Sequence, residues 1–135
     1  MADPTLCYMP ATEMARLIAA KTLSPVEVME ATIARVESVE ASINAFATFR
    51  PESALAAARE AEAAVARGDP LGPLHGVPVT IKDLAETEAV PTMKGSYILQ
   101  HNVPDFSTAL VTRLERSGAI SLGKTTTSEF GWKAV

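Results

Sequence analysis

A lysine at the end of a short apolar run is the residue whose position most clearly suits it for chemistry. Residues 77–81 alternate apolar side chains with proline and threonine, are bounded by glycine and proline, and lead into Lys82 and Asp83. This alternation predicts a strand with the Lys82 amine at its tip. In an α/β sheet that position faces the crevice in which ligands collect. On geometry alone, a solvated lysine that closes an edge strand is the commoner arrangement.

A second pattern lies further along the chain. Residues 118–125 (GAISLGKT) match every position of the P-loop pattern, a glycine-rich motif that binds nucleotide phosphates. A phosphate cradle follows an apolar strand and opens a helix at its lysine, so that backbone N–H groups face the phosphates. Here a charged segment, 113–117, precedes the first glycine, and residues 119–122 favour a strand. We therefore prefer a strand to nucleotide binding through 118–125, which stays as an alternative.

Composition and charge exclude several classes of function. The chain has 135 residues, 47% of them hydrophobic, and a net charge of −4. Its length supports one domain with a core. Acids and bases are interspersed, without the basic stripe typical of nucleic-acid binding. Because we find neither a secretory leader nor an apolar window long enough to span a membrane, we expect a cytoplasmic protein with no nucleic-acid or membrane partner.

Disulfide and metal chemistry find little support in the sequence. Cys7 is the only cysteine, so the chain forms no internal disulfide and offers no cysteine cluster to zinc. His75 and His101 are far apart and lack the close helical pairing of a metal-binding motif. We therefore expect no metal site.

Helices are expected to occupy most of residues 1–70. Apolar periodicity and composition predict helices over 12–20, 25–43 and 52–67. Ser24 is the expected N-cap of the second helix, with Pro25 at its first position and Glu27 completing a capping box. Gly68 is the expected left-handed cap of the third. Between these two helices, alternation over 43–49 predicts a strand or extended segment.

Residues 71–135 are expected to alternate strand, loop, helix and strand. The strand at 77–81 precedes a loop over 83–95, and a helix with Ser107 as N-cap runs to residue 116. A strand at 119–122 is ended by Gly123, and a helical turn begins near Glu129. The alternation of helix and strand indicates an α/β protein.

Four short blocks together resemble the N-terminal part of the amidase signature family. They are 72–83 (GPLHGVPVTIKD), 95–96 (GS), 117–125 (SGAISLGKT) and 129–131 (EFG). More weakly, the resemblance extends back to Thr12 and so covers nearly the whole chain. It implies the family's α/β/α sandwich, a mixed sheet covered by helices on both sides. Residues 1–135 would then be the N-terminal part of a single amidase-signature domain.

The resemblance also implies an amidase, a hydrolase of carbon–nitrogen bonds in small-molecule amides. The family's catalytic lysine, which works with two serines, a nucleophile and a bridge, in a Ser-Ser-Lys arrangement, maps onto Lys82, so the resemblance implies the same role for Lys82. A lysine accepts a proton only when its amine is neutral, and burial favours that form. Backbone N–H groups would stabilise the oxyanion. This chemistry requires no metal and no organic cofactor.

The two serines themselves are expected outside this chain. The family carries them in a glycine- and serine-rich segment downstream of the Glu-Phe block, and no serine here stands in such a context. The serines of the chain are Ser24, Ser38, Ser42, Ser53, Ser96, Ser107, Ser117, Ser121 and Ser128. We therefore expect residues 1–135 to be inactive alone. The remainder of the amidase chain, or a homo-oligomer, would be needed to cover exposed core.

Two departures from the family pattern bear on the kind of amidase. Thr126 stands where the family often has asparagine, and Trp132 follows the Glu-Phe-Gly block. Both favour a stand-alone amidase over the subunit that transfers ammonia onto charged tRNA. The alternative is a catalytically silent binding or subunit module that keeps Lys82.

Overall fold

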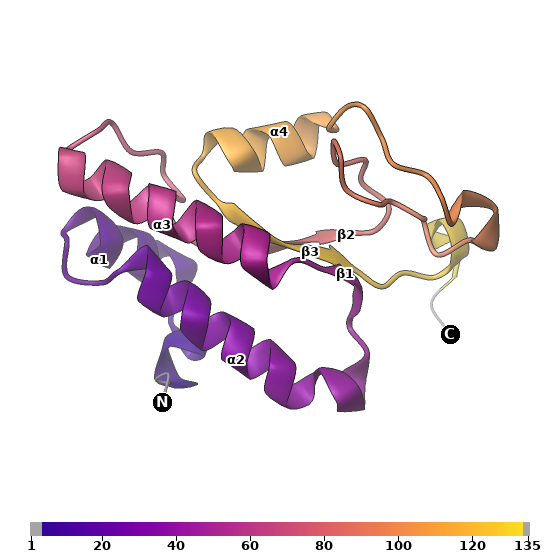
Figure 1. Ribbon diagram of the computed structural model, residues 1–135, viewed down its shortest axis with the longest axis horizontal. Coiled ribbons are helices and arrows are strands. Elements are labelled where there is room, and N and C mark those ends of the chain that lie inside the picture. The colour runs from indigo at the N-terminus through magenta and orange to yellow at the C-terminus, as the bar shows by residue number, and fades with distance from the viewer. Residues whose placement is uncertain (1–3, 134–135) are drawn as a thin grey trace.

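The computed structural model describes residues 4–133 and shows a mixed α/β fold (Figure 1). In chain order, the helices and strands are α1 (Ala11–Ala19), α2 (Pro25–Ile43), β1 (Phe46–Phe49), α3 (Pro51–Arg67), β2 (Pro78–Lys82), α4 (Ala109–Arg116) and β3 (Ile120–Thr125). Short 3-10 turns are η1 (Pro4–Tyr8), η2 (Tyr97–Leu99) and η3 (Glu129–Gly131). The predicted α/β class is confirmed.

The three strands form one mixed sheet in the order β1-β3-β2. β1 runs antiparallel to β3, whereas β2 runs parallel to it. Parallel neighbours need a crossover connection, and α4 lies within the segment that joins β2 to β3. Because the strand order is β1-β3-β2, β2 is an outer strand within the described residues, and its last residue lies at an open edge of the sheet.

Helices α2 and α3 pack side by side and cover β3. Figure 1 shows α3 alongside α2, with α4 on the opposite side of the strands from α2. Small side chains let α3 approach the sheet closely, and they recur at helical spacing. One of the two core clusters of buried residues in the described part of the chain consists of Met29, Ala54, Ala58, Ala61, Ile120 and Leu122. The alanine density of α3 therefore serves close helix packing.

Local chemistry sets two helix ends as predicted. The Ser24 hydroxyl accepts the N–H groups of Val26 at 3.0 Å and Glu27 at 3.2 Å, which caps α2. The same hydroxyl donates to the Glu62 carboxylate on α3, so that the cap also ties the two helices together. Gly68, at φ 80°, is the left-handed cap of α3.

The expectation that Gly123 ends a strand is wrong. β3 continues through Gly123 to Thr125. The φ of Gly123 is 133°, and a Cβ at this position would lie 2.0 Å from the carbonyl oxygen of Thr48. Glycine is required here because β1 approaches β3 closely, which is a recognised role of glycine within strands.

The expected N-cap of α4 is also wrong. The helix begins at Ala109 with Thr108 as its N-cap. Ser107 instead accepts the backbone N–H of Glu88 at 3.0 Å through its hydroxyl. The Ser107 hydroxyl, which the local pattern predicts as the cap of the helix, is thus bound by a backbone N–H in the loop after β2.

Candidate active site

Lys82 is the last residue of β2, as the sequence predicts. Its register partner on β3 is Thr125. The Lys82 carbonyl accepts the N–H of Ala85 at 3.0 Å, and the next N–H, that of Asp83, donates to the Thr125 carbonyl at 3.0 Å. The peptide group that follows Lys82 is therefore held by two backbone hydrogen bonds, one within the turn and one to β3.

The side chain of Lys82 is exposed, although its neighbours are not. Ile81 is 3% exposed and Asp83 is 1% exposed. Successive side chains of a strand point to opposite faces, so Lys82 points away from the interior that holds its two neighbours. Residues 4–133 therefore do not supply the burial that a neutral amine at Lys82 would need.

A second lysine, Lys124 on β3, is fully buried. Its Nζ donates to the Ala85 carbonyl at 2.6 Å and to the Thr92 hydroxyl at 2.7 Å. The Oδ1 atom of Asp83 lies 3.9 Å from the same nitrogen. The sequence motifs mark Lys124 as part of a P-loop match and of the block 117–125, and neither motif predicts its buried role. The available signal was its place in an apolar strand.

Burial lowers the pKa of the Lys124 amine, because leaving water penalises the charged form. The carboxylates of Asp83 and Glu86 act in the opposite direction, while Lys94 adds to the lowering. Lys94 itself forms an ion pair with Glu86, with 2.5 Å between Nζ and Oε1. The turn after β2 thus gathers two lysines and two carboxylates.

The segment that follows β2 closes on Asp83. Both carboxylate oxygens accept the Met93 N–H, at 3.3 and 3.1 Å. The Asp83 carbonyl accepts the N–H of Lys94 at 3.0 Å. Thr92, which is fully buried, donates its N–H to the Asn102 carbonyl at 3.0 Å. Residues 83–94 therefore form a loop whose two ends meet beside Lys82.

Two of the short sequence blocks meet next to this loop. The Ser96 hydroxyl donates to the Glu129 carboxylate at 2.7 Å, and the Phe130 N–H donates to the Lys94 carbonyl at 2.8 Å. Gly95 has a φ of 67°, and a Cβ there would lie 2.7 Å from the carbonyl oxygen of Thr127. The blocks 95–96 and 129–131 are distant in sequence, but they are hydrogen-bonded to each other and to Lys94, the last residue of the 83–94 loop.

The structure does not support a P-loop at 118–125. Residues 120–125 form β3, and the next element after Lys124 is the short turn η3 rather than a helix that opens at the lysine. The buried amine already donates to Ala85 and Thr92. The predicted strand is confirmed and is longer than expected.

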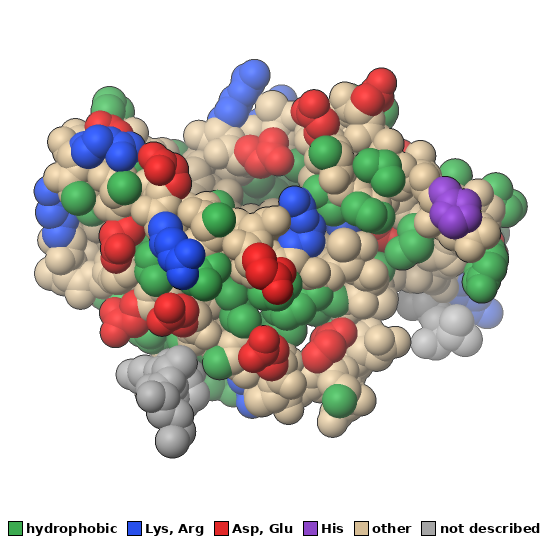
Figure 2. Space-filling model, viewed as in Figure 1, with side chains coloured by type: hydrophobic (Ala, Val, Ile, Leu, Met, Phe, Trp, Pro, Cys, Tyr) green, Lys and Arg blue, Asp and Glu red, His purple; other side chains and the backbone are tan. Residues whose placement is uncertain are grey.

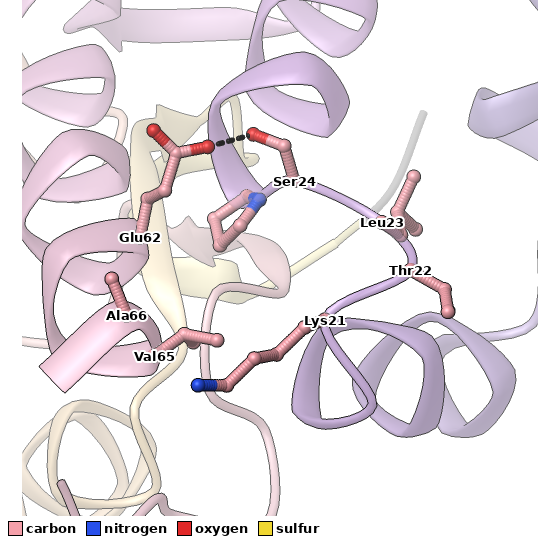
Figure 3. Close-up of a pocket in the computed structure, with 8 residues that line it drawn as sticks. Lys21, Thr22, Leu23, Ser24, Glu62, Val65 and Ala66 are labelled. Atoms are coloured by element: carbon pink, nitrogen blue, oxygen red, sulfur yellow. Dashed lines mark hydrogen bonds between the residues drawn. The ribbon is translucent and has the colours of Figure 1, made fainter. Parts of the chain in front are cut away.

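One cavity lies away from Lys82, between the α1–α2 turn and α3. It has a volume of about 300 Å³. Figure 3 shows the Ser24 hydroxyl directed at Glu62, with the Lys21 side chain extending beneath Val65. Lys82 is not among the residues that line it. We assign this cavity to helix packing rather than to the candidate site.

Residues 4–133 lack two further kinds of feature. No helix there combines the length and the apolar character needed to cross a membrane. Those residues also contain no group of three or more histidine, cysteine, aspartate or glutamate side chains that could hold a metal ion. Cys7 is a half-buried free thiol that donates to the Ala31 carbonyl at 3.5 Å.

Comparison with known proteins defines the class to which this fold and site belong. The sequence profile of the family described as Amidase matches residues 27–134. The chain belongs to the amidase family, and the family resemblance stated from the motifs is confirmed.

Individual relatives include both a hydrolase and part of a transferase. An acylamidase from Rhodococcus erythropolis is 42% identical over 132 residues, which are 98% of this chain and 28% of that protein. One subunit of the glutamyl-tRNA(Gln) amidotransferase from Carboxydothermus hydrogenoformans is 42% identical over 125 residues, 93% of this chain and 26% of the relative. The chain thus spans about a quarter of the length of these relatives.

Solved structures show the same fold. The peptide amidase of Stenotrophomonas maltophilia superimposes with a TM-score of 0.86 at 28% identity, over 95% of this chain and 26% of the amidase. A fatty acid amide hydrolase gives a TM-score of 0.85 at 28% identity, over 91% of this chain and 22% of the hydrolase. These similarities confirm the predicted amidase-signature α/β fold.

Proposed function

We propose that this chain is part of an amide hydrolase and that Lys82 is the general base of its reaction. Family membership supports amide chemistry. The observation that carries the assignment of Lys82 is its place at the end of β2, between two buried neighbours, with the peptide group that follows it hydrogen-bonded through both its carbonyl and its N–H. A catalytic side chain needs such a rigid origin, because small displacements of a reacting group are costly.

In the proposed reaction, Lys82 accepts the proton of a bridging serine, which in turn accepts the proton of the nucleophilic serine. The nucleophile's oxygen bonds to the amide carbonyl carbon. The carbon–nitrogen bond then breaks, and the amine leaves with a proton. Water hydrolyses the acyl-enzyme and releases the acid. Both serines would come from outside residues 1–135, and no cofactor takes part.

The exposure of Lys82 places a requirement on the complete protein. In water a lysine amine is protonated near neutral pH and accepts no proton. The remainder of the amidase chain, or a second copy of this chain, would have to cover Lys82 so that desolvation favours the neutral amine. We therefore propose that residues 1–135 are inactive alone.

The same cover would remove apolar surface from water. Figure 2 shows hydrophobic side chains at the surface on the right of the molecule, where Figure 1 places the segment between β2 and α4. The large apolar side chains exposed on this segment, on α4 and near η3 are Tyr97, Ile98, Val103, Phe106, Leu110, Phe130 and Trp132. Patches of this kind favour association.

The proposed substrate is a small-molecule amide. The amidotransferase subunit and the acylamidase are equally identical to this chain, at 42%, so identity does not choose between hydrolysis and transfer. Thr126 and Trp132 depart from the family pattern in a way that favours a stand-alone amidase, and on that basis we propose one. The match to the amidotransferase subunit favours a second candidate, a subunit module that hydrolyses no free amide.

Rapid-quench mass spectrometry of the complete protein tests this proposal. Mixed with a small aryl amide, the protein should gain the mass of the acyl group, and peptide mapping should place the adduct on a serine outside residues 1–135. In Lys82→Ala the adduct should not accumulate. Lys133→Ala removes another exposed lysine and should keep the adduct.

Two results would count against the proposal. An adduct that maps to a serine within residues 1–135, or that forms undiminished in Lys82→Ala, would contradict the assigned roles. The absence of any adduct and of any turnover across acyl groups would favour the subunit module.

A further inference from the structure

We propose that Lys124 is a positioning residue for Lys82. By holding the loop 83–94, it fixes the strand end from which Lys82 projects. The role of Lys82 in this inference rests on the proposed function, whereas the anchoring of the loop stands on the contacts of Lys124 alone.

Lys124 contacts the loop at both of its ends. Its Nζ donates to the Ala85 carbonyl at 2.6 Å and to the Thr92 hydroxyl at 2.7 Å. A lysine ammonium has three N–H donors. Asp83 Oδ1 is 3.9 Å from the nitrogen, which is too far for a hydrogen bond but close enough for charge attraction. One buried side chain thus joins the beginning of the loop to its end.

A short path leads from Lys124 to the backbone of Lys82. Lys124 Nζ donates to the Ala85 carbonyl, and the Ala85 N–H donates to the Lys82 carbonyl at 3.0 Å. On the other side, Asp83 is held by the N–H of Met93 through its carboxylate. If the Lys124 contacts are lost, the residues that follow Lys82 lose the anchor that fixes their direction.

Lys124 acts through Lys82 rather than on substrate. Its side chain has no exposed surface in residues 4–133, whereas Lys82 is exposed at the end of an outer strand. A substrate that approaches this edge of the sheet meets Lys82 and not Lys124. The geometry of Lys124 therefore gives it a supporting role.

Two variants of the complete protein separate positioning from stability. Lys124→Met removes the amine while keeping a side chain of similar length, but it leaves Asp83 as a buried carboxylate without its partner. The double variant Lys124→Met with Asp83→Asn also removes that charge. Lys133→Met makes the same chemical change at an exposed lysine and is the matched control.

Amide hydrogen exchange over residues 83–94 reports the anchor, and kcat and KM for a small amide report its consequence. In both variants, exchange in this loop should accelerate by about tenfold, because buried hydrogen bonds to it are lost. We expect kcat to fall by about 100-fold, the typical cost of a misplaced reacting group, while KM changes by less than about twofold. The double variant should regain thermal stability relative to Lys124→Met without regaining kcat.

Several outcomes would overturn the inference. Unchanged exchange over 83–94 would show that Lys124 does not anchor the loop. Recovery of kcat in the double variant would mean that only the unpaired charge mattered. Accelerated exchange with normal kcat in the Lys124 variants, together with an inactive Lys82→Ala variant, would show that anchoring the loop does not position Lys82 for catalysis.

The proposed function is judged separately by Lys82→Ala. If that variant keeps full turnover, the proposed function fails, and the positioning of Lys82 as a base fails with it. Accelerated exchange in Lys124→Met would then still establish the anchor of the loop. If Lys124→Met does not fold, the double variant carries the same comparison.

Discussion

The carboxylate of Asp83 and the amine of Lys124 lie 3.9 Å apart, and both side chains are buried, at 1% and 0% exposure. Their hydrogen bonds go elsewhere: Asp83 accepts from the Met93 N–H, and Lys124 donates to Ala85 and Thr92. The exposed Lys82 immediately precedes Asp83 in the chain. The candidate base is therefore the sequence neighbour of one member of a buried charge pair, whose other member lies on β3.

The pH dependence of stability should carry the signature of Lys124. Burial lowers its pKa in the folded protein below the ordinary value of 10.5. Between the lowered value and 10.5 the unfolded chain binds more protons, so the free energy of unfolding rises with pH. The folded state is therefore most stable, with respect to Lys124, above pH 10.5, where the amine is neutral in both states. This contribution to the free energy of unfolding is lost as pH falls through the lowered pKa.

Urea unfolding of the wild type and of Lys124→Met, measured from about pH 7 to about pH 10.5, checks this prediction. The difference in unfolding free energy should shift in favour of the wild type as pH rises, because only the wild type carries the buried amine. Parallel curves would show that the amine titrates alike in the folded and unfolded states.

A methyl group at Gly123 should destabilise the sheet. The added Cβ would lie 2.0 Å from the Thr48 carbonyl oxygen, and the φ of 133° is unfavourable for alanine. We expect Gly123→Ala to lower the free energy of unfolding by about 3 kcal/mol. Gly68→Ala is the matched control: its φ is also positive, at 80°, but a Cβ there meets nothing within 4 Å.

For Gly68→Ala we expect a loss of about 1 kcal/mol, from the backbone conformation alone. Guanidinium unfolding of both variants gives the comparison. Equal losses would show that the contact between β1 and β3 relaxes without cost.

Residues 1–135 produced alone should expose apolar surface and hydrolyse no amide. Tyr97, Ile98 and Trp132 are 86%, 83% and 91% exposed. Surface of this kind binds hydrophobic dyes and promotes self-association. Dye fluorescence and light scattering, compared per molecule with the complete protein, measure the effect. A monomer that binds no dye, or that turns over a small amide, would contradict the expected need for cover.

Much of the local structure was predictable from neighbouring residues. Ser24 before Pro25 and Gly68 after an alanine-rich stretch set helix ends through chemistry that acts within one turn. The alternation before Lys82 placed that residue at a strand tip. These features depend on contacts between residues that are close in the chain, so local sequence patterns predict them.

Other features depend on partners that are remote in the chain. Lys124 is buried because Ala85 and Thr92, which are 39 and 32 residues away, accept its hydrogen bonds. From its neighbours in the chain, Gly123 is expected to end a strand. The need for glycine within β3 follows only from the close approach of β1. Periodicity and local motifs carry no information about such neighbours, so the partners of the buried lysine and the uninterrupted strand could not be predicted from them, although the apolar strand around Lys124 indicated its burial.

The most direct test of the central claim is the turnover of a small amide by the complete protein with Lys82→Ala. Removal of a general base that activates a nucleophile should lower kcat by about 1,000-fold or more. Circular dichroism should be unchanged, because Lys82 belongs to neither hydrophobic core cluster of residues 4–133. Lys133→Ala should keep wild-type kcat. A Lys82→Ala protein that retains wild-type kcat would contradict the assignment of Lys82 as the base.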